Sequence, residues 1–431
     1  MLARHQLFTL SSTEYKLPHY VDGDGRLTSR CADQVPLFQW PDGSWCHDAN
    51  RFMRELYERQ LARSGRGGSL ATAAAHISHL LRFAWDRKLL LSQLTDDDFT
   101  AFMSSLITQG SSTGGGCRKR TPRTVIEIGR SCLALLESAA RHRGDGGAIG
   151  IDGQIRLLAG STRNRGTGKY RYATGALKHA AFPQPSAKKR RLPIDQQSIQ
   201  SLARACGTAS STSHQRMRRL VMLRLLEVTG GRRAEIAALT VRSVIEADLM
   251  DRPMLRLITL KTRFASPPER LVPISRTDLS LLRTYVEIYR MPVVRKHLRT
   301  KDHGLLLVND RTGTPLRPDS LTHEVRRLAL GAGLRVRASP HLFRHRFITR
   351  LFVALIEQHR IQNSDHFRQM LLEGETLRRM VAEWTGHQEL SSLDHYIHLA
   401  FDEAGTGESR INRHRAREAV ESLLLSIDTL T

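Results

Sequence analysis

One tyrosine near the carboxyl end of the chain and two arginines before it could together break a phosphodiester bond. Tyr396 can attack phosphorus and form a phosphotyrosyl ester. The guanidiniums of Arg232 and Arg344 are planar and always charged, so each can bind two oxygens of a pentavalent phosphorane. An ordinary tyrosine has a pKa of about 10, so this nucleophile needs help in losing its proton. These residue types predict phosphoryl-transfer chemistry.

Three short stretches carry the two arginines and the residues that could assist them. Glu235 follows Arg232 by one helical turn and is expected to orient it rather than to react. His341 precedes Arg344 by the same spacing and could act as general base or share in phosphate binding. His345 is expected to be a packed, hydrogen-bonded histidine. The stretches are TGGRRAEI at 229–236, PHLFRH at 340–345 and WTGH at 384–387.

In this order, the stretches resemble the tyrosine recombinase (phage integrase) family, which has a TGxRxxE stretch, an HxxRH box, a GH pair and then a tyrosine. The resemblance implies that Arg232 rather than Arg233 is the active arginine. It also implies a lysine on a β-hairpin between the two boxes. Lys261 fits that place and would protonate the departing 5′ oxygen, with Arg263 as the competing residue. His387 would donate a hydrogen bond to a phosphate oxygen.

The resemblance implies a site-specific DNA recombinase that cuts and rejoins strands through a 3′-phosphotyrosyl intermediate, as an integrase or transposase of a mobile element. Its expected partner is double-stranded DNA with paired recombination sites, bound by a homotetramer, with related recombinases or accessory DNA-bending proteins as further partners. Two alternatives stay open: a type IB topoisomerase-like strand transferase, and a catalytically inactive basic DNA-binding regulator. Topoisomerases share this chemistry but have no need of paired sites.

The overall charge is consistent with a polyanionic partner. Lys and Arg total 66 against 42 Asp and Glu, which gives a net charge of +24 with histidine neutral. A chain that is also 40% hydrophobic is globular rather than a polybasic tail, so the charge indicates nucleic acid. Aromatic residues make up only 6%, which disfavours a dedicated single-strand binder.

No metal or nucleotide cofactor is expected. The five cysteines include no CxxC pair, and the chain has neither a Walker motif nor an acidic cluster of metal-ligand type. Transesterification retains the energy of the phosphodiester bond, so it requires no ATP. No apolar stretch is long enough to span a membrane, and no signal-peptide pattern is present. We therefore expect a protein of the bacterial cytoplasm or nucleoid without a membrane partner.

Hydrophobic periodicity predicts a mainly α fold with a small antiparallel β-sheet (α+β). Residues 1–47 are an extension of unknown role, in which Pro41-Asp42-Gly43 signals a turn and hence a small hairpin or ordered arm. Four amphipathic helices are predicted within 48–150, a helical, SAM-like core-binding domain by resemblance. In the catalytic domain, 193–431, strands at Met254–Leu260 and Arg270–Ile274 form a hairpin among helices at 196–206, 216–228, 276–300, 318–332, 342–360 and 374–384.

Residues 151–192 are predicted to form a basic linker, because 153–191 hold basic residues but no Asp or Glu. A solvated linker is one interpretation, and a strap that neutralises phosphates between two DNA-gripping domains is the other. The candidate DNA-binding residues are Lys188, Lys189, Arg190 and Arg191 in this segment and Arg118, Lys119 and Arg120 before it. The last residues, AREAVESLLLSIDTL, predict an amphipathic helix that either covers its own domain or docks onto a neighbouring subunit.

Overall fold

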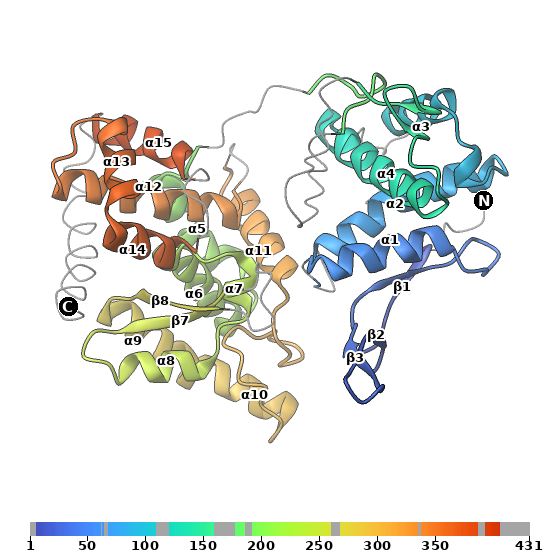
Figure 1. Ribbon diagram of the computed structural model, residues 1–431. Coiled ribbons are helices and arrows are strands. Elements are labelled where there is room, and N and C mark those ends of the chain that lie inside the picture. The colour runs from blue at the N-terminus through green and yellow to red at the C-terminus, as the bar shows by residue number, and fades with distance from the viewer. Residues whose placement is uncertain are drawn as a thin grey trace. The chain divides into compact units, whose positions relative to one another are not determined.

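The structure is a computed structural model that describes residues 6–61, 63, 68–108, 120–158, 177–185, 192–259, 268–334, 338–386 and 393–405. The chain divides into two compact units, 1–189 and 190–431, each with a hydrophobic core of its own (Figure 1). The predicted fold class is confirmed: helices dominate, and the strands form small two-stranded sheets. One of these sheets, of very short strands, is parallel rather than antiparallel.

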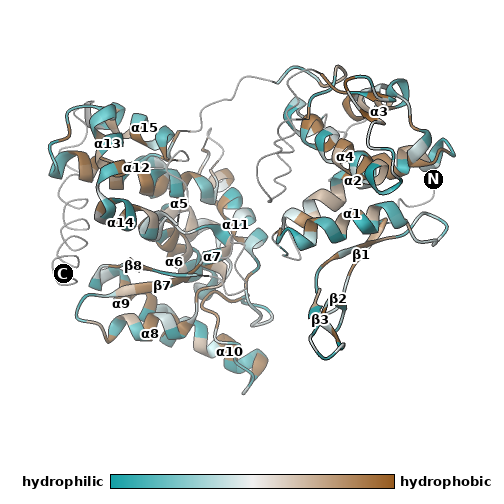
Figure 2. Ribbon diagram, in the orientation of Figure 1, coloured by the Kyte–Doolittle hydropathy of each residue, from teal (hydrophilic) through white to brown (hydrophobic). Residues whose placement is uncertain are grey.

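Unit 1 is built around helices whose apolar residues meet in one core. Figure 2 shows hydrophobic and hydrophilic residues alternating around them, the pattern that one buried face produces. Thr121 caps α4, where its side-chain oxygen accepts the Thr124 backbone N–H at 3.3 Å and Pro122 takes the first helical position. The helices are α1 (His47–Glu58), α2 (Ser69–Asp86), the 3₁₀ turn η1 (Leu91–Gln93), α3 (Asp96–Thr108) and α4 (Pro122–His142).

The N-terminal segment contributes strands that pack with these helices. Strand β1 (Phe8–Leu10) pairs with β4 (Pro36–Phe38), and β2 (Lys16–Val21) pairs with β3 (Leu27–Cys31), both antiparallel. The Asn50 side chain in α1 exchanges two hydrogen bonds with the Phe38 backbone, at 2.6 and 2.9 Å. The arm predicted around residues 41–43 is present, closed by a bridge between Gln39 and Trp45. Buried residues of this segment therefore share the core of unit 1, namely Leu7, Ala32, Val35, Phe38 and Cys46.

Part of the segment predicted as a linker is folded into unit 1. Residues 149–150 and 155–156 form the short parallel strands β5 (Ile149–Gly150) and β6 (Ile155–Arg156). Further on, buried His179 lies 3.0 Å from the carboxylate of Asp96 in α3. A Cβ on Gly129 in α4 would come within 2.6 Å of the Phe182 ring, so that glycine makes room for it. Residues 177–185 are therefore a packed element.

Unit 2 surrounds an antiparallel hairpin with helices. Strand β7 (Met254–Ile258) pairs with β8 (Glu269–Pro273) in the place where the sequence predicted a hairpin. The helices before it are α5 (Gln196–Ala209), α6 (Ser213–Thr229), α7 (Arg233–Ala237) and α8 (Val241–Asp248). After it come α9 (Arg276–Thr284), the π-helical turn η2 (Tyr285–Arg290), α10 (Met291–Leu298), α11 (Pro318–Gly331), α12 (Pro340–Gln358), α13 (Ser364–Glu373), α14 (Glu375–Thr385) and α15 (Asp394–Gly405).

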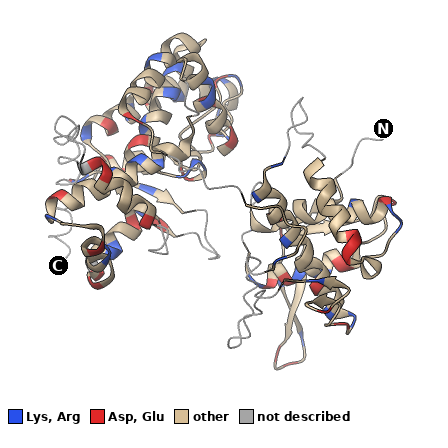
Figure 3. Cartoon of the chain, turned by 90° about the horizontal axis from the view of Figure 1, so that it is seen from above, with Lys and Arg blue, Asp and Glu red and all other residues tan. Residues whose placement is uncertain are grey.

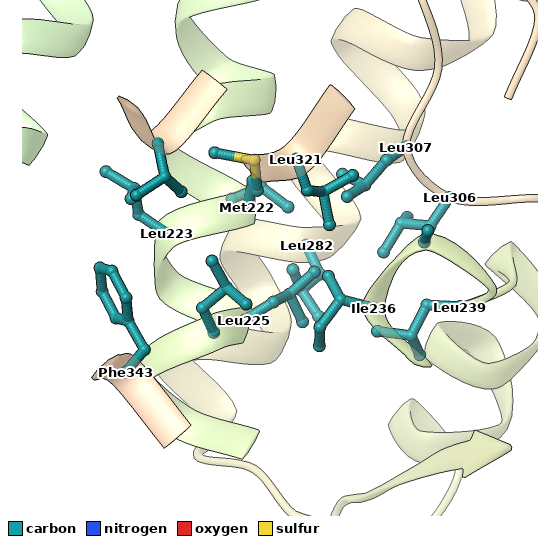
Figure 4. Packing of buried hydrophobic residues seen from close by; sticks show 14 of the residues in the cluster. Met222, Leu223, Leu225, Ile236, Leu239, Leu282, Leu306, Leu307, Leu321 and Phe343 are labelled. Atoms are coloured by element: carbon teal, nitrogen blue, oxygen red, sulfur yellow. The ribbon is translucent and has the colours of Figure 1, made fainter. Parts of the chain in front are cut away.

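Two hydrophobic clusters hold unit 2 together. The larger cluster joins α6 to residues from many other elements, including Ile236, Leu282, Leu321 and Phe343 (Figure 4). The second cluster lies between α12 and the helices α13 to α15, and it contains Phe352, Phe367 and Tyr396. Helix α12 contributes to both clusters, so its position is fixed from two sides. His341, Arg344 and His345, which the sequence singled out on this helix, therefore lie on a well-supported element.

Candidate active site

Arg232 is placed by a sharp reversal between α6 and α7. Helix α6 ends at Gly230, whose φ of +55° is a left-handed conformation that glycine adopts without a side-chain penalty. The Thr229 hydroxyl accepts the Gly231 N–H at 3.1 Å and supports the turn. Glu235 then accepts the Arg232 N–H at 3.0 Å and its guanidinium at 2.7 Å. The three-residue spacing of the sequence motif thus lets one carboxylate hold both ends of Arg232.

Arg344 lies buried on α12 and reaches two other elements. Its guanidinium donates to the carbonyl of Gly230 at 2.9 Å and to the carbonyl of Thr385. Burial, and then repulsion from nearby Arg232, lower the pKa of Arg344 to about 9. The protein therefore holds this cation in a place where a phosphate would be a strongly favoured partner.

The C-terminal end of α14 connects the arginines. Its last carbonyls have no helical partners, and Gly386 ends the helix with a φ of +60°. Arg270 binds the Trp384 carbonyl at 2.5 Å, Arg344 binds that of Thr385, and Arg232 binds that of Gly386 at 3.1 Å. Cations suit the negative end of a helix dipole. This helix end therefore gathers arginines from β8, α12 and the α6–α7 turn.

The structure brings Arg232, Arg344 and His341 to one cavity of about 300 Å³. His341 is exposed at the first turn of α12, where backbone N–H groups favour an anion. The rest of the lining includes Arg233, which forms an ion pair with Asp319 at 2.8 Å and donates to Thr322 at 3.2 Å. Gly231, Thr322, Ser339 and Pro340 complete the lining. A cavity with this charge and these donors suits a phosphodiester.

Tyr396 on α15 is buried beside this cavity's residues and is not part of its lining. Burial raises its pKa, while the charges of Arg344 and then Arg232 act in the opposite direction. Its ring lies 5.1 Å from that of His345, which in turn lies 4.3 Å from that of His341. His345 is thus packed between the exposed histidine and the tyrosine, as the sequence suggested for a packed residue.

Helix α13 supports the helix that carries the tyrosine. Arg368 in α13 binds Asp394 at 3.1 Å and His398 at 2.9 Å, both in α15. Residues 359–374 lie between His341 and His387 in the sequence. They include α13, which binds α15 and so helps to fix its position.

Two predicted site residues, Lys261 and His387, lie outside the residues that the structure describes. Lys261 belongs to the connection between β7 and β8, and His387 directly follows Gly386. Of the predicted DNA-binding residues, Lys188 to Arg191, Arg118 and Lys119 also lie outside the described ranges, as does the C-terminal segment 406–431. Arg120 is half-buried and donates to the Leu106 carbonyl at 3.2 Å.

Within the described ranges, no cluster of His, Cys, Asp and Glu side chains could hold a metal ion. In the same part of the chain, every helix is too short or too polar to cross a bilayer. The sequence did not single out Arg270, because nothing in the local pattern of strand β8 distinguishes it. Its importance depends on contacts 35 and 114 positions away along the chain.

Comparisons with known proteins point to one family. Residues 193–370 match the phage integrase family. Tyrosine recombinase XerD of Corynebacterium glutamicum is 29% identical over 263 residues, 59% of this chain and 75% of the relative. XerD of Chlorobaculum tepidum is 28% identical over 188 residues, 44% of this chain and 51% of the relative. XerC of Bacillus subtilis is 29% identical over 184 residues, 43% of this chain and 50% of the relative. In the last two, the chain spans about half the length of the relative.

Solved structures of similar proteins include XerH site-specific recombinase bound to the palindromic difH substrate. Its sequence identity is 18% and its TM-score is 0.49, and the match covers 85% of this chain and 89% of that chain. Another is lambda integrase bound to DNA, with 17% identity, a TM-score of 0.44, and coverage of 74% and 89%. The match over residues 193–370 and the sequence similarity to XerC and XerD support a place for this chain among the phage integrases, the tyrosine recombinases.

Proposed function

We propose that this chain is a site-specific DNA recombinase that cuts and rejoins strands through a 3′-phosphotyrosyl intermediate. The observation that carries the proposal is the cavity in which Arg232, Arg344 and His341 converge. Burial raises the pKa of Tyr396, and the tyrosine lies close enough to Arg344 and Arg232 for their charges to oppose that rise. Preorganised cations at a water-poor site stabilise the charge that develops on phosphorus.

The reaction balances without a cofactor. The Tyr396 oxygen forms a bond to phosphorus while the bond from phosphorus to the 5′ oxygen breaks. His341 is the candidate that takes the tyrosine proton or shares in phosphate binding, and Lys261 is the candidate that protonates the leaving oxygen. Arg232 and Arg344 bind the non-bridging oxygens, and His387 donates to one of them. Attack by a DNA 5′ hydroxyl on the phosphotyrosyl bond then reverses the steps and restores a phosphodiester.

A bound DNA phosphate would complete the site formed by the cavity and Tyr396. The Tyr396 ring is packed against His345 and does not line the cavity. DNA that fills the cavity with a negative phosphate would supply a partner for both arginines. The wider proposal is integration, excision or transposition of a mobile element by a homotetramer on paired sites, with the C-terminal segment docking between subunits.

Covalent trapping tests the proposal. Full-length protein is mixed with nicked duplexes from the ends of its own genetic element, and the products are separated on a denaturing gel. We expect a protein–DNA adduct that is absent with Tyr396→Phe, because phenylalanine offers no nucleophile. Absence of an adduct on every end tested, despite tight binding in native gels, would favour the inactive regulator.

A second assay separates recombinase from topoisomerase. Supercoiled plasmid lacking the mapped sites is incubated with the protein. We expect it to stay supercoiled, because a recombinase needs its sites. Efficient relaxation that Tyr396→Phe abolishes would instead favour the topoisomerase alternative.

A further inference from the structure

Arg270 is a buried arginine outside the residues that line the cavity. It lies on β8, and only 3% of its side chain is exposed. Its guanidinium donates to Glu235 at 2.8 Å and to the Trp384 carbonyl at 2.5 Å. Burying a guanidinium is unfavourable unless it is well paired, so the surrounding structure is organised to satisfy these bonds. Glu235 also binds Arg232, and Trp384 lies three residues before His387.

The first partner, Glu235, is the residue that holds Arg232. One carboxylate oxygen accepts the Arg232 guanidinium at 2.7 Å, and the other accepts both the Arg232 N–H at 3.0 Å and Arg270 at 2.8 Å. Burial alone would raise the pKa of Glu235, but Arg270 and then Arg232 lower it below its ordinary value. Arg270 therefore keeps this buried carboxylate charged and fixes its orientation.

The two arginines that share Glu235 differ in what they face. The Arg232 side chain is 26% exposed and lines the cavity. The Arg270 side chain is buried and is not part of the cavity lining. A substrate phosphate can therefore meet Arg232 but not Arg270. The contribution of Arg270 must pass through the groups it holds.

The second partner fixes the other side of the site. The Trp384 carbonyl belongs to the last turn of α14, whose next carbonyls bind Arg344 and Arg232. The ideal Cβ position of Gly386 lies 3.5 Å from Arg270, so the arginine packs directly against the turn. His387 follows this turn in the sequence. One rigid guanidinium thus spans the Glu235 carboxylate and the helix end that precedes a proposed phosphate ligand.

We infer that Arg270 is a positioning residue with two effects. Through Glu235 it holds Arg232 in the geometry needed for catalysis, and through the Trp384 carbonyl it fixes the C-terminal end of α14. This inference rests on the proposed function for its effect on cleavage, but its effect on the Arg232–Glu235 contact is independent of that function. Only arginine offers a planar fork that satisfies both partners at once; lysine is a point charge. We therefore expect lysine to restore part of the effect and a neutral side chain none.

The test compares Arg270→Met and Arg270→Lys with a matched control, Arg290→Met. The Arg290 side chain is 1% exposed and binds Asp302 at 2.6 and 2.8 Å and the Leu305 carbonyl at 2.8 Å. It belongs to η2 and does not line the cavity. Its removal therefore reproduces the loss of a buried paired arginine without touching Glu235 or α14.

Two readouts are measured on full-length variants. In hydrogen–deuterium exchange, we expect the Arg232 amide, which donates to Glu235, to exchange about tenfold faster in Arg270→Met. In single-turnover cleavage at saturating DNA, we expect Arg270→Met to be slowed about 100-fold with unchanged DNA affinity, because misplaced catalytic groups lower the rate rather than binding. Arg270→Lys should fall between Arg270→Met and the unsubstituted protein, and Arg290→Met should change neither readout.

Equal Arg232 amide exchange in Arg270→Met and Arg290→Met would overturn the inference, whether or not the protein cleaves DNA. Equal slowing of cleavage by the two substitutions would do the same, because the effect would then be general destabilisation. If the unsubstituted protein forms no adduct on its own DNA, the proposed function fails, and the exchange comparison still decides the role of Arg270.

Discussion

The surroundings of Arg344 disfavour its charged form, so the charge of this residue depends on pH. Burial and repulsion from Arg232 lower the pKa of Arg344 to about 9 in the DNA-free protein. Arginine is ordinarily charged at every pH that a protein meets, and burial makes Arg344 an exception. Below about pH 9 its guanidinium is charged and can bind a phosphate, and as the pH rises through about 9 the guanidinium loses its proton. A bound phosphate favours the charged form and raises the pKa again.

We therefore expect the protein's preference for a charged scissile phosphate to fall as the pH rises through about 9. The measurement uses Tyr396→Phe, which removes the titrating tyrosine, and compares the affinity for a mapped duplex with that for one carrying a neutral methylphosphonate at the scissile position. The methylphosphonate duplex controls for every other phosphate contact. An affinity ratio that stays constant from pH 7 to pH 10 would contradict the assigned pKa of Arg344.

At the residue scale, the sequence could predict those contacts that depend on residue type and local spacing. Arg232 with Glu235, and His341 with Arg344, are pairs one helical turn apart, so periodicity alone places them together. Arg270 could not be found in this way. Its partners are distant in the sequence, and only the folded arrangement of β8 against α14 makes it part of the site.

At the element scale, the α6–α7 turn is the part on which both arginines depend. Gly230 has a φ of +55°, its carbonyl accepts from Arg344, and a Cβ there would overlap the Phe347 ring. A left-handed non-glycine residue costs about 1–3 kcal/mol even before such an overlap. The turn thus requires glycine for conformation and for space.

We expect Gly230→Ala to lower the free energy of unfolding by about 1–3 kcal/mol or more and to reduce cleavage. The matched control is Gly207→Ala in helix α5, where a Cβ meets nothing within 4 Å; there we expect stabilisation by about 0.5–1 kcal/mol. Scanning calorimetry of the full-length variants measures both. A Gly230→Ala protein as stable as the unsubstituted one would refute the argument for the turn.

The sequence marks an element boundary where a capping residue and an apolar stripe coincide, as at Thr121 and Pro122 at the start of α4. The segment 177–185 was predicted as part of a linker because residues 153–191 as a whole hold basic residues but no Asp or Glu. It folds because His179 and Phe182 find long-range partners in α3 and α4, which composition does not reveal. The π-helical turn η2 inside the predicted 276–300 helix was likewise not visible as a pattern.

At the scale of the whole molecule, the net charge of +24 predicts DNA binding that weakens steeply with salt. In Figure 3 the positions of Lys and Arg are spread along the backbone of both units and are interspersed with those of Asp and Glu, so the charge alone does not locate the contacts. The cavity does supply a location. Arg233 and Thr322 lie in the same lining as Arg232 and Arg344, and the cavity's size leaves room for backbone beyond one phosphate.

We expect Arg233 to contact DNA phosphate when the cavity is filled, exchanging its ion pair with Asp319 for that contact. Arg233→Gln should then reduce the slope of log affinity against log salt concentration by about 0.9, the value of one phosphate contact on duplex DNA. The matched control is Arg242→Gln on α8, which removes the same charge from an arginine paired with Glu246 at 2.7 Å and outside the cavity lining. Its slope should equal that of the unsubstituted protein. Because both substitutions change the net charge equally, identical slopes for the two would show that Arg233 makes no such contact.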